Sequence, residues 1–341
     1  MNDRSNECLL PSTEISKNEI KESWNNYLLN NETPIATVIE ITNVCPNNCA
    51  HCYANLSIGK NTLNISPNTF KNWLDTISEN DNKPEQIWLV GGEPTSNPML
   101  KKYLQKTREY GFQPMIVTTG ESFANKDYAR EIVPNADEID ITIRGLGAFH
   151  DLMMKSADDE LLLSTPKGLS VDNQIKFALE KISQESNSNE HFDNTLQGLT
   201  NISEIINETG INTKIGLNVD IQATTDLYDI ISLLKSKNIN IDNIILQVQT
   251  FSDDNAHLAN ILPNLWRKPT TEIIEKYYKQ ANELVNNNIY DGNIEIIDPL
   301  PTDILDELKA KGIDLGALYN PASTPAIGPN GRLRSNVVKE S

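Results

Sequence analysis

Short β-branched and apolar runs alternate along this chain with longer stretches in which apolar residues recur every three or four positions. This alternation covers residues 35–251 and predicts repeated strand–helix units around a parallel sheet. Six runs have strand character: 35–42, 87–90, 114–119, 139–144, 214–221 and 244–249. Six such units are too few to close an eight-stranded barrel. We therefore expect an α/β fold with an open, partial (β/α)6 barrel whose strand C-termini form the reactive face.

Helix boundary signals lie between the predicted strands. Ser66-Pro67 offers an N-cap followed by proline at the first helical position, and Asn97-Pro98 repeats this pair. The helix after Asn97 is expected to stop at Gly111 as its C′ residue. Asp193 is the expected N-cap of a third helix, which ends before Gly210.

The chain divides by pattern into a segment at 1–34, the barrel at 35–251 and an extension at 252–341. Residues 150–190 are a long insertion after the fourth strand, and we expect either a wall over the substrate or a surface decoration. The extension predicts a helix at 271–285, a strand at 294–297 and a hairpin at 324–338. Pro329-Asn330-Gly331 is the expected turn of that hairpin.

The composition and charge of the chain limit the kinds of partner that it is expected to bind. The 341 residues are 38% hydrophobic, which is enough to bury a core, and the formal net charge is -18. That charge argues against nucleic acid, because polyanion binding relies on clustered Lys and Arg. No apolar run approaches the length that crosses a bilayer, and no signal peptide is evident, so we expect a cytoplasmic protein without membrane contact.

Three cysteines follow the first predicted strand in the run Cys45-Pro-Asn-Asn-Cys49-Ala-His-Cys52. An iron–sulfur cube normally takes one thiolate per iron, and the only other cysteine, Cys8, lies far upstream. This favours a cluster with one iron open for chemistry. The alternative is a zinc site that adds His51, although adjacency of His51 and Cys52 makes joint ligation awkward.

The cysteine spacing, with His51 just before the last thiol, and the tetrapeptide Gly91-Gly92-Glu93-Pro94 after the second strand resemble the radical S-adenosylmethionine (radical SAM) superfamily. The resemblance implies a 4Fe-4S cluster held by Cys45, Cys49 and Cys52, with SAM chelating the open iron. It further implies a partial TIM-type barrel, an electron donor such as flavodoxin or ferredoxin, and cleavage of SAM to a 5′-deoxyadenosyl radical that abstracts a hydrogen atom. The tail faintly resembles SPASM or twitch extensions without their cysteines.

Several positions match cofactor contacts of that family. The resemblance implies that the Gly91–Pro94 segment contacts the amino group of SAM, that Thr119 and Asn218 lie near the ribose, and that Tyr53 lies near adenine. Thr142 ends the fourth strand where relatives carry a serine. The cofactor-binding set is then His51, Tyr53, Gly91, Gly92, Glu93, Pro94, Thr119, Thr142, Arg144 and Asn218.

Candidates for chemistry beyond the cofactor are Arg144, Glu40 and His257. Arg144 replaces an acid that is usual in the family, and it fits either a carboxylate clamp or a structural ion pair with Glu40 or Glu93. Glu40 is expected inside the barrel, either as a structural group or as a substrate contact. His150 and Asp151 follow the fourth strand and more often order a loop than catalyse.

We expect a radical SAM enzyme that acts on a small polar metabolite in natural-product biosynthesis. The expected reaction is a rearrangement, decarboxylation, dehydration, epimerisation or oxidation. A single cysteine cluster favours this class. Modification of a ribosomally made peptide is the alternative within the superfamily. From another class, a non-enzymatic zinc-binding protein is the alternative if no iron–sulfur cluster forms.

Overall fold

The computed structural model describes residues 15–31, 34–47, 49, 52, 63–155, 177, 180, 190–221, 226–247, 270–296, 300–318, 325–330 and 332–334. The chain forms two compact units. Unit 1 comprises Met1–Pro46, Leu56–Met115 and Thr324–Val337, and unit 2 comprises Asn47–Asn55, Ile116–Ser323 and Val338–Ser341. Each unit is described by itself.

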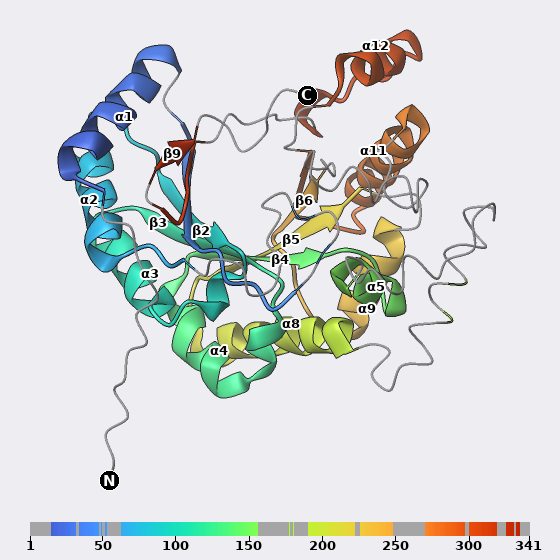
Figure 1. The fold of residues 1–341 in the computed structure, drawn as a ribbon. Helices are drawn as coiled ribbons and strands as arrows, with labels where there is room; N and C mark the ends of the chain where they lie inside the picture. Colours follow the sequence, from blue (N-terminus) through green and yellow to red (C-terminus); the bar gives the residue numbers. More distant parts are fainter. Residues whose placement is uncertain are drawn as a thin grey trace. The chain divides into compact units, whose positions relative to one another are not determined.

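Unit 1 is built on two adjacent parallel strands, β1 (Ala36–Thr42) and β2 (Gln86–Gly91). On its other side β1 pairs in parallel with β8 (Ala326–Ile327), which forms an antiparallel hairpin with β9 (Leu333–Arg334). The helical elements of this unit are α1 (Lys17–Asn30), α2 (Pro67–Ser78), η1 (Pro94–Ser96) and α3 (Leu100–Glu109). Helices α1 to α3 lie on the outer side of the strands (Figure 1).

The core of unit 1 is aromatic where α1 meets α2. Trp24 and Trp73 are fully buried, and their rings meet edge to face with centroids 6.4 Å apart. Burial of such rings, at roughly 25 cal/mol per Å² of apolar area, is the main term that holds α1 on the unit. The sequence pattern did not predict α1, which begins with a capping box at Ser16 and Glu19.

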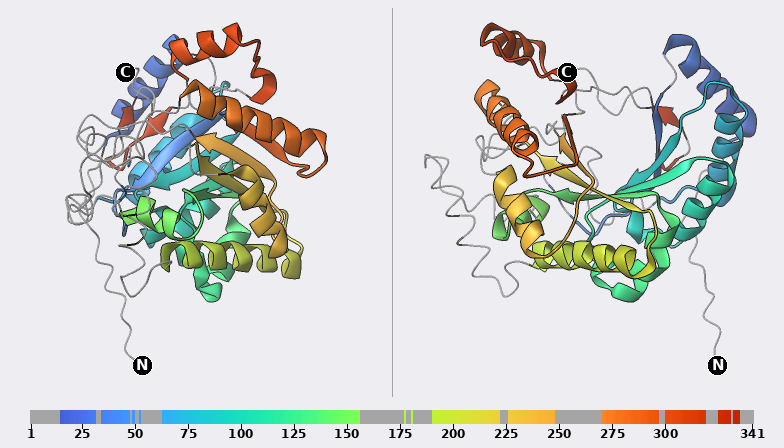
Figure 2. Two further views of the ribbon diagram at one scale, coloured as in Figure 1. Left: turned by 90° about the vertical axis from the view of Figure 1, so that its right-hand side faces the viewer. Right: turned by 180° about the vertical axis from the view of Figure 1, so that it is seen from behind.

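Unit 2 continues the parallel strands with β4 (Glu138–Ile143), β5 (Lys214–Asp220), β6 (Asn243–Gln247) and β7 (Asn293–Ile296). Each pairs in parallel with the next. The α-helices are α4 (Lys126–Ile132), α5 (Ala148–Lys155), α8 (Glu190–Thr209), α9 (Leu227–Ser236), α11 (Thr271–Asn286) and α12 (Thr302–Ala310). Three short 3₁₀ turns are η2 (Glu121–Ala124), η3 (Val133–Asn135) and η5 (Gly316–Leu318). Helices α8 and α9 cover the outer face of these strands (Figure 2).

The strand order is β7-β6-β5-β4-β3-β2-β1-β8-β9, and β3 (Gln113–Thr118) crosses the boundary between the units. The six predicted strands are all present, and their observed ends fall within two residues of the predicted ones wherever both lie in the described chain. The parallel partial barrel is confirmed. Two strands of the predicted extension, β7 and β8, add to its edges, and the predicted hairpin is confirmed as β8 and β9.

Two predicted helix caps are wrong. Helix α3 begins at Leu100, two residues after Pro98, with Met99 as its N-cap residue. Asn97 Oδ1 still accepts from the Met99 N–H at 2.8 Å, but in a turn that precedes the helix, and Asn97 Nδ2 donates to Ile41 O at 2.8 Å. Helix α8 begins at Glu190, so Asp193 lies in its first turn and is not its cap. Ser66 caps α2 as predicted.

The predicted C′ glycines are in place, and part of the insertion is helical. Gly111 and Gly210 follow α3 and α8 with positive φ angles of 83° and 67°, as expected for C′ glycines. The predicted insertion begins with α5, not with a loop. Its predicted internal helix and polar end lie mostly outside the described residues.

Candidate active site

The end of β1 and the Gly91-Gly92 turn are packed backbone against backbone in unit 1. A Cβ on Gly91 would lie 2.1 Å from Thr42 O, and one on Gly92 would lie 2.4 Å from Val44 O. The N–H groups of Gly92 and Glu93 donate to these two carbonyls at 2.8 Å each. Only glycine permits this approach. The two glycines therefore hold the start of the cysteine loop on the strand that precedes it.

The Glu93-Pro94 half of the motif forms a buried turn. Glu93 is 2% exposed, and its carboxylate accepts from Thr95 N–H at 3.1 Å and from Thr95 Oγ1 at 2.7 Å. Pro94 opens η1, where its missing N–H costs nothing. The carboxylate thus orders the turn through one of its oxygens.

Glu40 and Thr42 are buried on β1, with 5% and 0% of their surfaces exposed. Thr42 Oγ1 accepts from the Val44 N–H at 3.0 Å, which continues the tie between the strand and the loop. All seven residues of β1 are buried. Burial therefore does not distinguish the two faces of β1, and the place of Glu40 inside the barrel stays a prediction.

In unit 2, Cys49 and Cys52 lie on one turn, since the Cys52 N–H donates to Cys49 O at 3.1 Å. Both are free thiols, and Cys49 Sγ lies 3.7 Å from Met154 Sδ of α5. Loss of hydration raises the pKa of the Cys49 thiol to about 12; the Arg144 charge opposes this, whereas Cys52, Asp220 and Glu121 add to it. A metal must displace the thiol proton on binding.

Arg144 follows the end of β4 and pairs with the last residue of β5. Its Nη1 lies 2.6 Å from Asp220 Oδ2, and the two side chains are 18% and 2% exposed. The predicted ion pair therefore exists, but the prediction of Glu40 or Glu93 as partner is wrong: register brings Asp220, on the strand next to β4, to this position. Arg144 Nε has no hydrogen-bond partner among the residues that the structure describes.

A second network joins the cysteine loop to α8. Asn47 Nδ2 donates to Glu121 Oε1 at 3.1 Å, and Glu121 Oε2 lies 2.8 Å from His191 Nδ1. Asn47 is 4% exposed. None of these three residues was a candidate in the sequence, because the contacts join residues that are 74 and 70 positions apart.

Strands β4 and β5 carry a buried polar face. Thr142 is the register partner of Asn218, and Asp140 is the partner of Gly216, so these positions lie on one side of the sheet. Asp140, Thr142 and Asn218 are 0%, 7% and 2% exposed. Within the described part of the chain, Asn218 Oδ1 has no hydrogen-bond partner, and the Asp140 carboxyl accepts from no N–H or hydroxyl group.

Asp140 is one of two adjacent buried carboxyls on this face. Burial raises its pKa well above the ordinary value, and the neighbouring Glu138 adds to the rise. Burial also raises the pKa of Glu138, whereas a hydrogen bond from Asn243 opposes that shift. Gly216 makes room for the pair, since a Cβ there would lie 1.9 Å from Asp140 Oδ1.

His150 and Asp151 order the segment after β4, as the sequence favoured. The Arg144 N–H donates to His150 Nδ1 at 3.2 Å, and burial together with the Arg144 charge lowers the pKa of His150 to about 3. The Asp151 carboxylate accepts from the N–H groups of His191 and Phe192 at 3.3 and 2.8 Å. It therefore caps α8 from another element. His51, Tyr53 and His257 lie outside the described residues.

The donor set fits an iron–sulfur cluster in its chemistry: three cysteines that form no disulfide, two of them on one turn. Cys45 belongs to unit 1, and Cys49 and Cys52 belong to unit 2. Across the described ranges, no group of three or more His, Cys, Asp or Glu side chains is arranged to hold a metal. The three-cysteine ligand set stays a prediction.

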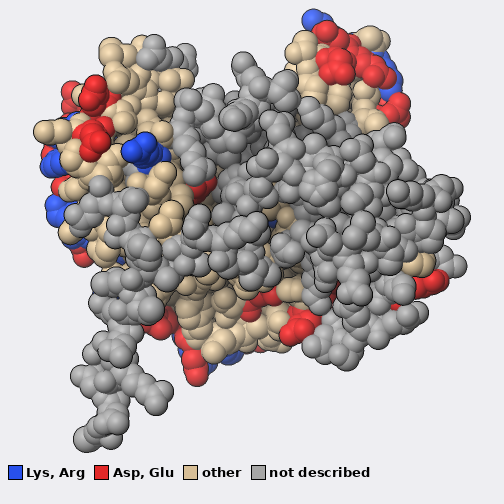
Figure 3. Space-filling view, viewed as in Figure 1, with Lys and Arg blue, Asp and Glu red and all other residues tan. Residues whose placement is uncertain are grey.

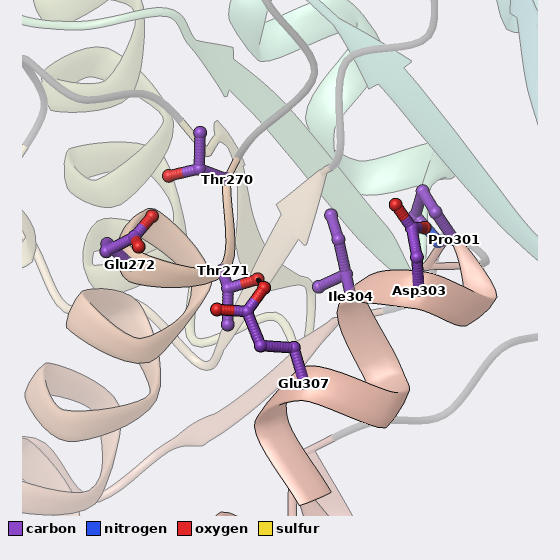
Figure 4. Close-up of a pocket in the computed structure, with 7 residues that line it drawn as sticks. All are labelled: Thr270, Thr271, Glu272, Pro301, Asp303, Ile304 and Glu307. Atoms are coloured by element: carbon purple, nitrogen blue, oxygen red, sulfur yellow. Dashed lines mark hydrogen bonds between the residues drawn. The ribbon is translucent and has the colours of Figure 1, made fainter. Parts of the chain in front are cut away.

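A surface cavity of about 370 Å³ lies elsewhere in unit 2, where α11 and α12 begin (Figure 4). Its lining residues are Thr270, Thr271, Glu272, Pro301, Asp303, Ile304 and Glu307. Acidic side chains gather on this part of the surface (Figure 3). Among the described residues that line it, none is basic. No helix in the described chain is long and apolar enough to cross a membrane.

Comparison with known proteins identifies a family segment. Residues 39–165 match the model of the Radical SAM superfamily. This segment contains all three cysteines, the Gly91–Pro94 motif and Arg144. None of the curated proteins searched is a significant match.

Solved structures share the fold. Streptococcus suis SuiB bound to S-adenosylmethionine is 15% identical, with a TM-score of 0.54, over 92% of this chain and 63% of SuiB. SuiB bound to its precursor peptide SuiA is 14% identical, with a TM-score of 0.55, over 90% of this chain and 60% of SuiB. The anSMEcpe structure with bound AdoMet is 11% identical, with a TM-score of 0.50, over 90% and 76% of the two chains. The chain thus spans less than two thirds of the length of SuiB.

Proposed function

We propose that this chain, which belongs to the radical SAM superfamily through its domain at residues 39–165, is an enzyme that cleaves SAM reductively and oxidises or rearranges a small polar substrate. Cys45, Cys49 and Cys52 would hold a 4Fe-4S cluster with one open iron. When bound, the cluster and SAM supply a 5′-deoxyadenosyl radical. A flavodoxin or ferredoxin would donate the electron, in a reducing compartment such as the cytoplasm, where the three thiols stay reduced.

In this proposal the chain's own residues orient SAM and exclude water. The Gly91–Pro94 turn would receive the amino group of SAM through its backbone carbonyls, and Thr119 and Asn218 would face the ribose. The resemblance assigns His51 and Tyr53 to the cofactor as well. Arg144 offers a guanidinium N–H toward a carboxylate of SAM or substrate while Asp220 holds its other side, at 2.6 Å.

One observation carries the choice of a polar substrate: the buried polar face of β4 and β5. Barrel interiors of this type are usually filled by bulky branched side chains. Here Asp140, Thr142 and Asn218 occupy that face, and Asn218 Oδ1 lacks a partner within the described residues. Each unsatisfied buried polar group costs about 1–3 kcal/mol. A ligand with several hydrogen-bonding groups would recover that free energy.

The test is anaerobic reconstitution with iron and sulfide, followed by dithionite, SAM and chromatography for 5′-deoxyadenosine. Wild type should bind about four iron and four sulfide per chain, as one cube requires, and release the nucleoside. Cys49→Ala should lose both. Zinc in place of iron and sulfide, with no nucleoside from wild type, would refute the proposal in favour of the zinc-binding alternative.

A second candidate, modification of a ribosomally made peptide, draws support from the shared fold with SuiB, one structure of which holds the precursor peptide SuiA. This candidate requires a peptide partner for this chain. Calorimetric titration with short peptides encoded beside its gene would test it. Binding at micromolar concentration, with a mass change of the peptide during turnover, would favour this candidate over a small metabolite.

A further inference from the structure

The segment between the first two cysteines of the motif is anchored by side chains from two distant elements. Asn47 donates to Glu121 Oε1 at 3.1 Å, and Glu121 Oε2 lies 2.8 Å from His191 Nδ1. Because a carboxylate only accepts, His191 Nδ1 carries the proton in this contact. All three residues belong to unit 2. One carboxylate therefore bridges the cysteine loop and the start of α8.

The turn that carries Glu121 is itself clamped to α8. Gly198 allows the helix to approach so closely that a Cβ there would lie 2.2 Å from Gly120 O. Thr195 Oγ1 donates to Thr119 O at 3.0 Å, and Asn201 Nδ2 donates to Phe123 O at 2.8 Å. These contacts flank Glu121 on both sides. Its backbone has little freedom, so its side chain is a fixed anchor for Asn47.

The orientation of His191 is fixed as well. Its N–H donates to Asp151 Oδ2 at 3.3 Å, as part of the cap that Asp151 provides to α8. The side chains of His191 and Glu121 are 18% and 19% exposed, so water competes only weakly for their contact. The imidazole thus holds the far oxygen of Glu121 while the near oxygen faces Asn47.

Glu121 also contributes charge at the cysteine turn. Its carboxylate is hydrogen-bonded to Asn47, which lies two positions before Cys49. The same negative charge disfavours the addition of an electron to a nearby cluster, because reduction makes the cluster more negative. Glu121 has two separable effects, a hydrogen bond to the loop and a charge beside it.

We propose that Glu121, oriented by His191, is a positioning residue that fixes the cysteine loop through Asn47 and tunes the reduction potential of the cluster. The effect of Glu121 on the cysteine loop does not require the cluster, so it can be tested in the cluster-free protein. The effect on the reduction potential rests on the proposed function, since it requires that the cluster forms.

The first experiment measures amide hydrogen exchange of a peptide covering residues 45–52 in the cluster-free protein. Glu121→Ala and Asn47→Ala should accelerate exchange about tenfold, the effect of losing one hydrogen bond to a charged group. Glu121→Gln keeps an acceptor for Asn47 and should exchange as wild type does. Glu204→Gln is the matched control, because Glu204 pairs with Lys126 on the outer part of α8. Wild-type exchange in both alanine variants would overturn the loop role.

The second experiment measures the midpoint potential of the reconstituted cluster by redox titration with electron paramagnetic resonance. Glu121→Gln should shift the potential to less negative values, whereas Glu204→Gln should not move it. An unchanged potential in Glu121→Gln would overturn the tuning role. Wild type that binds no iron and sulfide would contradict the proposed function and with it the tuning role, while the exchange result still decides the loop role.

Discussion

The pair β1–β2 in unit 1 and the pair β4–β5 in unit 2 are both parallel, yet they are specialised differently. At the end of β1, the backbone of Gly91 and Gly92 presses on Thr42 and Val44, and the fit leaves no room for a Cβ. On and just after β4 and β5, the side chains are matched by charge and hydrogen bonding: Arg144 is paired with Asp220, and Asp140 lies beside Glu138. The first pair positions a loop, and the second supplies functional groups.

The two regions should therefore tolerate different kinds of substitution. Added volume should damage the β1–β2 region most, because carbonyl oxygens cannot move aside as a flexible side chain can. Loss of a charge should damage the β4–β5 region most, because a buried partner is left uncompensated. The predictions below test this contrast.

The largest effect is expected from Asp220→Ala, which leaves the Arg144 guanidinium buried without its ion-pair partner. Breaking a buried pair on one side costs about 3–5 kcal/mol, and urea denaturation should show a loss of that size. The double variant Arg144→Met/Asp220→Leu should recover most of it. Glu208→Ala, which breaks exposed pairs with Lys126 and Arg130, should cost about 1 kcal/mol or less. Equal losses for Asp220→Ala and Glu208→Ala would remove the contrast.

Gly91→Ala should cost about 3 kcal/mol, since the new methyl group would meet Thr42 O at 2.1 Å and the backbone φ is +150°. The control is Gly111→Ala, where φ is +83° and no atom lies within 4 Å of the added Cβ. That variant carries only the backbone strain of about 1 kcal/mol. The measurement is the free energy of unfolding in urea. If both variants lose the same free energy of unfolding, then close packing against Thr42 is not the reason that position 91 needs glycine.

Asp140→Asn should stabilise the protein at pH 8 and leave it nearly unchanged near pH 4. The folded-state pKa of Asp140 is raised, so folding takes up a proton above the unfolded pKa of about 4. Stability from this group is therefore present at low pH and falls by about 1.4 kcal/mol per pH unit until the raised folded pKa is reached. Thermal unfolding between pH 4 and 8 measures the slope.

The matched control for that slope is Asp127→Asn, because the Asp127 side chain is 95% exposed. It should leave the pH dependence of the melting temperature as in wild type. If Asp140→Asn keeps the wild-type dependence of stability on pH, then Asp140 is ionised in the folded protein. That result would contradict the raised pKa of this buried carboxyl.

The smallest effect on stability is expected from Asn218→Leu. The Asn218 side chain is 2% exposed and its oxygen has no partner in the described chain, so an apolar group of similar size should change the unfolding free energy by about 1 kcal/mol or less. Binding of SAM to the reconstituted protein, measured by equilibrium dialysis, should weaken if Asn218 faces the ribose. Unchanged SAM affinity would place the ribose elsewhere.

Local sequence signals predicted the strands because side-chain type alternates with period two along them. In β4, Glu138, Asp140 and Thr142 alternate with isoleucines, and this pattern also marks the polar face. The same signal could have identified Asp220, which follows Asn218 at the next position on that face of β5. Asp220 lies outside the motifs that carry the family resemblance.

Local sequence signals do not predict contacts between residues that are far apart in the chain. Arg144 and Asp220 are 76 positions apart, and Asn47 and Glu121 are 74 apart, so nothing near either residue names its partner. The amide of Asn97 also donates to a distant partner, Ile41 O, 56 positions away. Gly91 and Gly92 were expected to contact SAM as part of the Gly91–Pro94 segment, and what they approach in the structure is the chain's own backbone.

The central claim is that Cys45, Cys49 and Cys52 leave one iron of a cluster open to SAM. Electron–nuclear double resonance on the reduced, reconstituted protein tests it directly, with SAM labelled by ¹⁵N at the amino group and ¹⁷O at the carboxylate. The account predicts hyperfine coupling to both labels in wild type and its absence in Cys49→Ala. A reduced 4Fe-4S cluster that binds SAM without coupling to either label would contradict it.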